Sequence, residues 1–169
     1  MSDELVTPRL RLRRARSDDL AAMHAVLSHP EAMRWWSTPP HQSLAQTAAW
    51  LEGMIASPPE LSEDFVVEVD GHVVGKAGCY RLPEIGYILH PRVWGRGYAT
   101  EALGAVIARV WEGRPEVQTL TADVDPRNAP SLRLLAKLGF RRTGFAERTW
   151  LVGDAWCDSV YLGLDRPAA

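Results

Sequence analysis

The segment Glu84–Ala102 constrains the fold more than any other part of the chain. An apolar run typical of a strand, Glu84–His90, leads into a short loop with glycine at positions 95 and 97, and a helix follows. Because glycine has no Cβ, such a loop turns tightly and lets successive N–H groups converge beside the helix N-terminus. These unpaired amides and the positive end of the helix dipole favour a phosphate or pyrophosphate.

The charges around this loop also fit an anionic ligand. Arg92 and Arg96 flank the glycines, and residues 92–142 contain nine Lys or Arg against five Asp or Glu, a local excess of +4 in a chain of net charge −2. An overall acidic chain with a basic segment favours a local anion over a nucleic acid. A plain strand-to-helix turn and a chance cluster of solvated arginines are the structural alternatives. The loop lacks the third glycine of the dinucleotide motif, which Thr100 replaces, and it is not a P-loop.

Periodicity divides the remaining chain into strands and helices. Apolar residues alternate around Leu10 and Leu12, Asp70-Gly71 is a favoured two-residue hairpin turn, and Ser17 and Ser43 have the sequence context of helix N-caps. This order of elements indicates an α+β, mixed-sheet fold, and 169 residues suit a single domain spanning 1–169. The predicted strands lie at about 9–13, 65–69, 73–80, 84–90, 117–124, 146–152 and 157–164, and the predicted helices at about 17–27, 43–54, 98–113 and 129–138.

Several classes of protein do not fit the composition. No run of about 18 apolar residues could span a membrane, and Met1–Val6 has no apolar signal region, so we expect a cytoplasmic protein. Cys79 and Cys157 lie far apart without a neighbouring Cys or His at metal-ligand spacing. We therefore expect neither a disulfide nor a metal, and both cysteines as small buried hydrophobes.

The loop Arg92-Val-Trp-Gly95-Arg-Gly97 resembles the acyl-CoA loop of the GNAT superfamily of N-acyltransferases, Gln/Arg-x-x-Gly-x-Gly/Ala. The chain is most similar to the RimJ/RimL-type branch of ribosomal-protein N-terminal acetyltransferases and their small-molecule relatives. The resemblance implies a mixed, mostly antiparallel seven-stranded sheet with about four helices, splayed between its fourth and fifth strands to admit acetyl-CoA. The segments that carry it are 7–12, 86–91, 94–102, 128–131 and 137–140.

The same resemblance implies how acetyl-CoA is held. Strand residues 88–90 offer backbone groups to the pantetheine arm and the thioester oxygen, the amides of 95–100 hold the pyrophosphate with Arg96 in reach, and Asn128 bonds the pantetheine amides. Strand core for Ile88 and Leu89, an exposed strand end for His90 and helix capping for Asn128 are the structural alternatives. The expected cofactor-binding residues are Ile88, Leu89, His90, Arg92, Gly95, Arg96, Gly97, Tyr98, Ala99, Thr100, Asn128 and Ser131.

Two residues occupy family positions associated with proton transfer. Ser131 stands where a hydroxyl protonates the departing thiolate, and Glu84 stands where several relatives carry a glutamate that removes the proton of the acceptor amine. A solvent-facing serine and a solvated strand-end carboxylate are the alternatives. With Glu84, the residues that the resemblance assigns to the acceptor groove are Trp35, Trp36, Trp150 and Trp156, for which core packing or a dimer contact is the alternative.

The expected function is transfer of an acetyl group from acetyl-CoA to a primary amine, either a protein N-terminal α-amine or a small-molecule amine, by direct transfer in a ternary complex. No metal is implied. A non-catalytic acyl-CoA-binding domain and an acyltransferase for a longer acyl-CoA are the alternatives, and binding of nucleic acid through the tryptophans is disfavoured by the overall acidity. The sequence leaves open whether the chain forms a homodimer.

Overall fold

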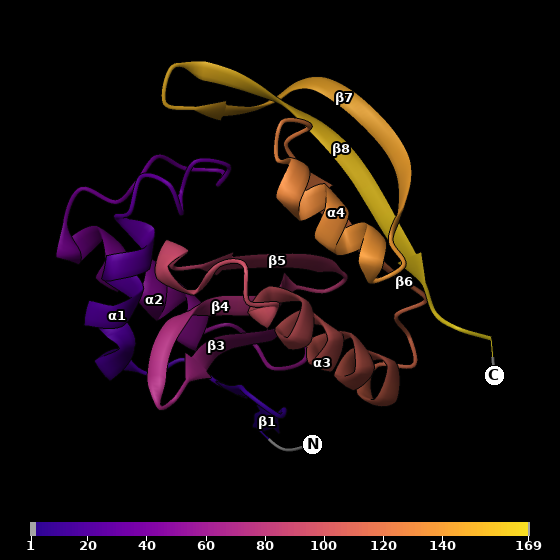
Figure 1. Ribbon diagram of the computed structural model, residues 1–169, viewed down its shortest axis with the longest axis horizontal. Coiled ribbons are helices and arrows are strands. Elements are labelled where there is room, and N and C mark those ends of the chain that lie inside the picture. Colours follow the sequence, from indigo (N-terminus) through magenta and orange to yellow (C-terminus); the bar gives the residue numbers. More distant parts are fainter. Residues whose placement is uncertain (1–2, 169) are drawn as a thin grey trace.

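Eight strands form one mixed sheet in the computed structural model, which describes residues 3–168 (Figure 1). The strand order is β1-β2-β3-β4-β5-β6-β8-β7, and neighbouring strands are antiparallel except β5 and β6. Every predicted strand is present, and the eighth is the three-residue β1, which is too short for alternation to predict. The strands are β1 Glu4–Val6, β2 Arg11–Arg13, β3 Glu63–Val69, β4 His72–Arg81, β5 Glu84–Leu89, β6 Thr119–Val124, β7 Arg141–Val152 and β8 Ala155–Asp165.

The α-helices are α1 Leu20–Leu27, α2 Leu44–Ile55, α3 Tyr98–Gly113 and α4 Ala129–Lys137, as the periodicity predicts, and 3₁₀ turns lie at Ser17–Asp19 and Pro91–Val93. Ser43 caps α2, since its hydroxyl accepts from the N–H of Gln46 at 3.1 Å. The predicted cap at Ser17 is wrong. The buried Asp19 carboxylate accepts from the N–H of Arg16 at 2.7 Å and fixes the turn before α1, because Arg13 already holds Asp19 in place.

Turn chemistry shapes the connections as expected. Asp70 and Gly71 adopt φ values of 49° and 77° in the β3–β4 hairpin, the left-handed region that a type I′ turn requires. At the end of α4, Gly139 has φ 93° and the N–H of Phe140 bonds to the carbonyl of Leu135 at 3.0 Å. This pattern is the Schellman motif, and it directs the chain into β7.

The sheet buries apolar residues on both faces because strand side chains alternate. Phe65 and Val67 of β3 belong to the cluster that packs under α3 and α4, whereas Val66 joins the cluster formed with α1 and α2. Ile85 and Leu89 of β5 likewise lie on the α3 side, and Ile88 lies on the α2 side. Odd-numbered positions of β5 therefore face one helical layer and even-numbered positions face the other.

The sheet opens between β5 and β6. These parallel strands pair at Glu84 and Thr121, where the N–H of Thr121 also bonds to the carbonyl of Pro83 at 3.0 Å, whereas β6 pairs with β8 from Thr119 to Val124. The predicted splay is confirmed, because β5 and β6 are the fourth and fifth of the strands that the sequence predicts. Among residues 3–168, no helix is long and apolar enough to cross a membrane.

Candidate active site

Two pockets meet at the gap between β5 and β6. The first, about 790 Å³, lies between β5 and the N-terminal ends of α3 and α4, and we call it the α4 pocket. The second, about 860 Å³, lies between α2, the start of β5 and the β7–β8 hairpin, and we call it the α2 pocket. Gly86 lines both, and a Cβ built on it would meet no atom within 4 Å. The two pockets therefore adjoin at this gap, which we call the passage.

The glycine loop forms one end of the α4 pocket. Gly95 and Gly97 have φ values of 72° and 79°, in the left-handed region that favours glycine, and Gly97 is the N-cap of α3. The first-turn N–H groups of a helix have no partner within the helix, so those of 98–100 are available to a ligand. Gly95, Gly97, Tyr98, Ala99 and Thr100 all line the pocket.

An N-terminal arginine that sequence reasoning missed braces this loop. Arg9 donates to the carbonyl of Arg96 at 2.7 Å, and its Nη2 lies 2.6 Å from the carboxylate of Glu101. Thr7 donates to the same carboxylate at 2.6 Å. Partial burial opposes ionisation, but these hydrogen bonds lower the pKa of Glu101 below its usual value. The contact joins residues 92 positions apart, so no local pattern could have predicted it.

Three expected cofactor residues stand apart from the lining of the α4 pocket. Arg92 and Arg96 are exposed beside the glycine loop, and His90 packs edge-on against His29 with 5.1 Å between ring centroids. Nδ1 of His90 accepts from the N–H of Arg92 at 3.1 Å. Burial, Arg92 and His29 lower the pKa of His90, so the ring is a neutral acceptor at pH 7 and the strand-end alternative fits it.

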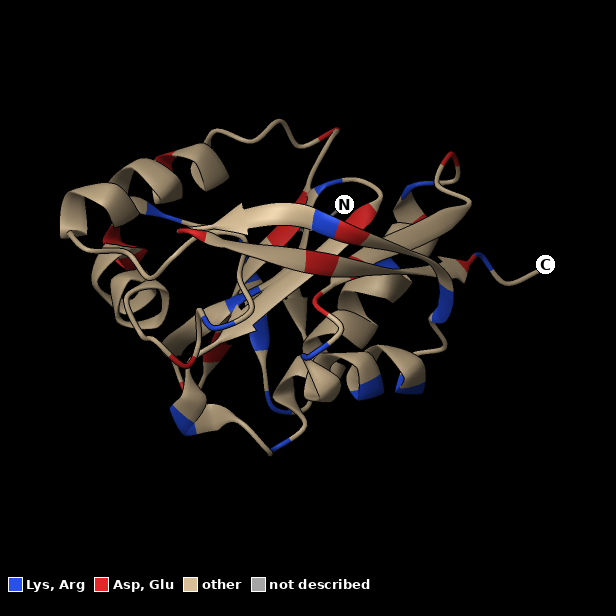
Figure 2. Ribbon diagram, turned by 90° about the horizontal axis from the view of Figure 1, so that it is seen from above, with Lys and Arg blue, Asp and Glu red and all other residues tan. Residues whose placement is uncertain are grey.

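Part of the local excess of basic residues is engaged in ion pairs. Arg109 and Arg114 both pair with the buried Glu63, at 2.6 and 2.7 Å, and Arg127 pairs with Asp125 at 2.6 Å. In the view of Figure 2, Lys and Arg are interspersed with Asp and Glu along the ribbon. Two of these pairs use Glu63, which lies outside the segment, and one uses Asp125, which lies within it.

A hydroxyl pair lies in the α4 pocket. Ser131, in the first turn of α4, is hydrogen-bonded through its Oγ to the Tyr87 hydroxyl, which comes from the middle of β5. Burial raises the pKa of Tyr87 while the bond to Ser131 opposes that shift. Sequence reasoning found Ser131 and missed Tyr87; its odd position on β5 points it toward α4, a signal that alternation alone contains.

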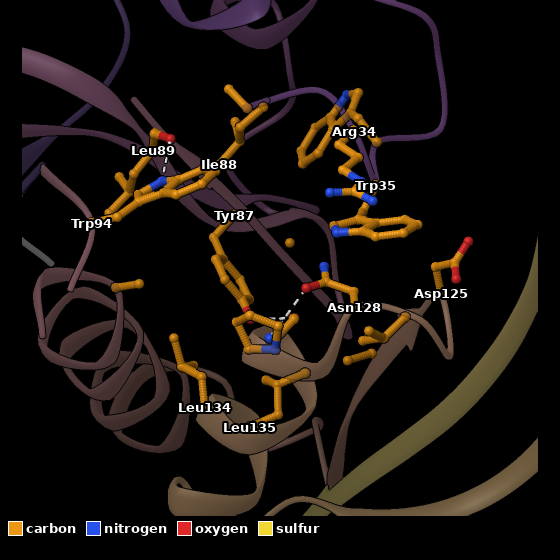
Figure 3. Close-up of a pocket in the computed structure, with 18 of the residues that line it drawn as sticks. Arg34, Trp35, Tyr87, Ile88, Leu89, Trp94, Asp125, Asn128, Leu134 and Leu135 are labelled. Carbon is orange, nitrogen blue, oxygen red and sulfur yellow. Dashed lines mark hydrogen bonds between the residues drawn. The ribbon is translucent and has the colours of Figure 1, made fainter. Parts of the chain in front are cut away.

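The remaining polar groups of the α4 pocket are already partly engaged (Figure 3). Oδ1 of Asn128 accepts from the N–H of Ser131 at 3.3 Å, so the capping role is present, and its amide nitrogen remains for a ligand. The carbonyl of Leu89 accepts from Nε1 of Trp94 at 2.8 Å. Ile88 and Leu89 are buried strand core and also line the pocket, so their predicted role in cofactor binding stays a prediction.

The α2 pocket contains the carboxylates. Glu84, at the first position of β5, is exposed to the pocket and has no hydrogen bond or ion pair among the described residues. Partial burial and the charge of Asp123 raise its pKa above the usual value. Asp123 itself accepts from Nε1 of Trp150 at 2.9 Å. Glu84 and the Tyr87–Ser131 pair therefore lie on opposite faces of the sheet, and the gap at Gly86 joins them.

Tryptophans form much of the wall of the α2 pocket. Trp35 lies between the guanidinium groups of Arg34 and Arg127, 4.8 and 5.0 Å from its ring centroid, and Trp36 packs partly on the α2-side core. Trp150 lines this pocket, and so does Trp50, which sequence reasoning did not assign. Trp156 lies outside the lining of both pockets, because it sits across from Leu151 on the hairpin.

The cysteines differ from each other. Cys79 is fully buried, as expected, whereas Cys157 is half-buried and lines the α2 pocket. Both thiols are free. No group of three or more His, Cys, Asp or Glu side chains in the described part of the chain is arranged to hold a metal ion.

An open mixed sheet that splays beside a glycine loop at a helix N-terminus defines the class of acyl-CoA-dependent acetyltransferases. Residues 9–141 match the acetyltransferase (GNAT) domain family, and the chain belongs to that family. Membership of this family implies acetyl-CoA as the acyl donor. The open glycine loop and the free first-turn amides of α3 fit the phosphates of that donor.

The relatives agree with this assignment. The chain is 32% identical over 81 residues to the uncharacterized N-acetyltransferase YnaD of Bacillus subtilis, which is 48% of this chain and 47% of that protein. It is 32% identical over 90 residues to the [ribosomal protein uS5]-alanine N-acetyltransferase of Escherichia coli, which is 53% of this chain and 46% of that enzyme. The aligned parts thus span about half the length of these curated relatives.

A solved structure of RimL, the ribosomal L7/L12 α-N-protein acetyltransferase, in complex with coenzyme A superposes with a TM-score of 0.83. Its sequence identity is 17%, over 95% of this chain and 96% of that one. This likeness concerns the fold, and the acceptor of this chain has to be argued from its own residues.

Proposed function

We propose that this chain transfers an acetyl group directly from acetyl-CoA to a primary amine, with the donor in the α4 pocket and the acceptor in the α2 pocket. The observation that carries the proposal is the placement of an unpaired carboxylate, Glu84, and a hydroxyl pair, Tyr87 and Ser131, on either side of one passage. A ternary complex needs two substrates to meet, and pockets joined through a gap in the sheet meet that requirement.

The α4 pocket has groups for each part of acetyl-CoA. The N–H groups from Gly97 to Thr100 would hold the pyrophosphate, with the Arg96 guanidinium near the loop surface. The free amide of Asn128 and the edge of β5 would hold the pantetheine arm. Bound there, acetyl-CoA supplies an activated thioester, and every other part of the reaction falls to side chains of this chain.

Glu84 is the proposed base, since an ammonium has no lone pair and must lose a proton before it attacks. At pH 7.4 that loss costs about 4 kcal/mol for a lysine of pKa 10.4 and about 0.5 kcal/mol for an α-amine of pKa 7.8. The raised pKa of Glu84 makes it a stronger base than a solvated carboxylate. A protein α-amine, as in the acceptors of the ribosomal-protein enzymes, or another amine of low pKa is deprotonated most readily.

Ser131 and Tyr87 are the proposed acid. The departing thiolate takes up one proton, and a tyrosine, with a pKa near 10, is closer to a thiol of pKa about 8.5 than an alkyl hydroxyl is. Because the two hydroxyls are bonded, Ser131 can pass a proton to sulfur and recover one from Tyr87. The pair then returns to neutrality through solvent.

Thiol release tests the proposal. Purified protein with acetyl-CoA should release free thiol at a rate that depends on added primary amine. Mass spectrometry should show that the mass of the amine increases by about 42 Da, because one acetyl group replaces one hydrogen. Propionyl- and succinyl-CoA report whether a longer acyl group is used. Binding of acetyl-CoA without amine-dependent release would instead favour a non-catalytic acyl-CoA-binding protein.

A further inference from the structure

Large apolar side chains form a substantial part of the walls of the α2 pocket. They come from four separate parts of the chain, namely the loop before α2, α2 itself, the end of β4 and the β7–β8 hairpin. Large aromatic side chains in a concave site provide most of the contact area for a small ligand. The apolar lining residues include Trp36, Trp50, Met54, Tyr80, Trp150 and Val152.

The hairpin and the loop before α2 approach each other over this pocket (Figure 1). A Cβ on Gly153, at the hairpin turn, would lie 3.9 Å from Cγ of Pro39. Trp150 ties the hairpin to β6 through its bond to Asp123, and Arg127 at the end of β6 stacks on Trp35 of the loop. The volume of about 860 Å³ falls in the range of small-molecule sites.

The charges of the pocket favour a single cationic head. The carboxylates of Glu84, Asp123 and Asp158 line the pocket and have no ion pair among residues 3–168. The lining cation Lys76 is already paired with Asp64 at 2.7 Å. Arg34 and Arg81 also line the pocket, are exposed and lie over aromatic rings, so they oppose a second positive charge on the ligand.

Resting on the proposed function, we propose that the acceptor is a small primary amine attached to an aromatic or bulky apolar group. Its ammonium lies beside Glu84 and Asp123 at the passage, and its apolar body lies among Trp36, Trp50 and Trp150. An apolar group on the acceptor would cover these aromatic side chains, whereas a purely polar polyamine would leave them in contact with water. An extended protein N-terminus with small side chains would likewise leave this apolar wall uncovered.

Matched acceptors test the class. With saturating acetyl-CoA, kcat/KM for 2-phenylethylamine should exceed that for ethylamine about ten- to a hundredfold, because only the former has an apolar group for the wall to bind. The comparison is matched, since both carry the primary amine on the same two-carbon chain. Spermidine should resemble ethylamine, and a peptide beginning with alanine should be used less well than 2-phenylethylamine although its α-amine is easier to deprotonate. Equal or better use of ethylamine, spermidine or the peptide would overturn the acceptor class and leave acetyl transfer intact. No amine-dependent thiol release with any acceptor would overturn the proposed function as well.

Two tryptophans on the hairpin provide a matched pair of variants. Trp150 is 45% exposed and lines the pocket, whereas Trp156 is 49% exposed and lies outside it. Trp150→Ala should reduce the preference for 2-phenylethylamine about tenfold, and Trp156→Ala should leave it unchanged. Trp150→Phe retains an aromatic wall without the bond to Asp123 and should keep most of the preference. If both alanine variants change the preference equally, the wall at Trp150 does not bind the acceptor.

Discussion

The ionisable groups at the passage are placed where the fold disturbs their pKa values in useful directions. Burial and the neighbouring Asp123 raise the pKa of Glu84, and burial raises that of Tyr87 against the opposing bond from Ser131. A stronger carboxylate base and an acid that remains protonated are what amine deprotonation and thiolate protonation require. One strand provides both, because Glu84 and Tyr87 have opposite parity on β5.

Replacing Glu84 with glutamine keeps its size and removes its basicity. Glu84→Gln should lower kcat about a hundredfold or more near neutral pH, and raising the pH should recover part of the loss by deprotonating the amine in solution. Wild-type kcat should fall as the pH drops through the raised pKa of Glu84. Glu147→Gln, an exposed change on β7 outside both pockets, is the control. A mutant with raised acceptor KM and normal kcat would indicate that Glu84 only attracts the amine.

The same substitution should stabilise the fold at neutral pH. A carboxyl whose folded pKa is raised stabilises the protein below its unfolded value, near 4.5, and loses that contribution as the pH rises through the folded pKa. Glu84→Gln removes the ionised form, so its Tm should exceed that of wild type at pH 7 and match it below about pH 4. Thermal melts at both pH values measure this. A lower Tm at pH 7 would show that the carboxylate is favourably solvated.

Removing the Tyr87 hydroxyl tests the proton relay. Tyr87→Phe should lower kcat about ten- to a hundredfold with little change in acetyl-CoA affinity, because only the return of a proton to Ser131 is lost. Ser131→Ala should cost as much or more, and the double mutant should be no worse than Ser131→Ala, since the two hydroxyls act in series. Tyr161→Phe, outside both pockets, is the control. Additive losses would separate the two hydroxyls into independent roles.

At the scale of an element, the N-terminal end of α3 acts as one braced unit. The loop before it turns on two left-handed glycines, and Arg9 and Thr7 hold it from the N-terminal segment through Glu101. Such a contact keeps the first-turn amides in position before any phosphate binds. Preorganised amides cost little to order on binding, which is the condition for a tight anion site.

Charge at this loop can be separated from shape by two substitutions at Gly95. A Cβ there meets no atom within 4 Å, and both aspartate and asparagine tolerate its φ of 72° better than most residues. Gly95→Asp should weaken acetyl-CoA binding at least tenfold more than Gly95→Asn, because only the aspartate repels the phosphates. Calorimetric titration of both folded variants measures the difference. Equal acetyl-CoA affinities of the two variants would show that this loop does not contact the phosphates.

At the scale of the whole molecule, the two pockets depend on how far β5 and β6 separate. Neither strand alone forms a site, since both pockets take residues from β5 and from β6 and share Gly86, Ile85 and Asp123. The loop before α2, the hairpin and the start of α4 all converge on this opening (Figure 1). A narrower opening should slow acetyl transfer while acetyl-CoA still binds.

Gly86→Val is the corresponding test. Gly86 has an ordinary strand conformation and valine favours strands, so the variant should fold and bind acetyl-CoA normally. Its side chain would enter the passage, and we expect kcat to fall about tenfold or more because the two substrates no longer reach each other. Gly86→Ala should lie between wild type and valine. Unchanged kcat in Gly86→Val would show that the substrates meet elsewhere.

Local structure could be predicted from the sequence because each of its signals depends on neighbouring residues. The glycine loop, the Asp70-Gly71 turn, the Ser43 cap and the order of strands and helices follow from φ preferences, capping and periodicity. The tertiary structure decided the contacts between distant residues, such as Tyr87 with Ser131, separated by 44 positions, and Trp150 with Asp123, separated by 27. Such pairs depend on the strand order and on the width of the gap between β5 and β6. A sequence pattern predicts neither of these, because both are set by how whole elements pack.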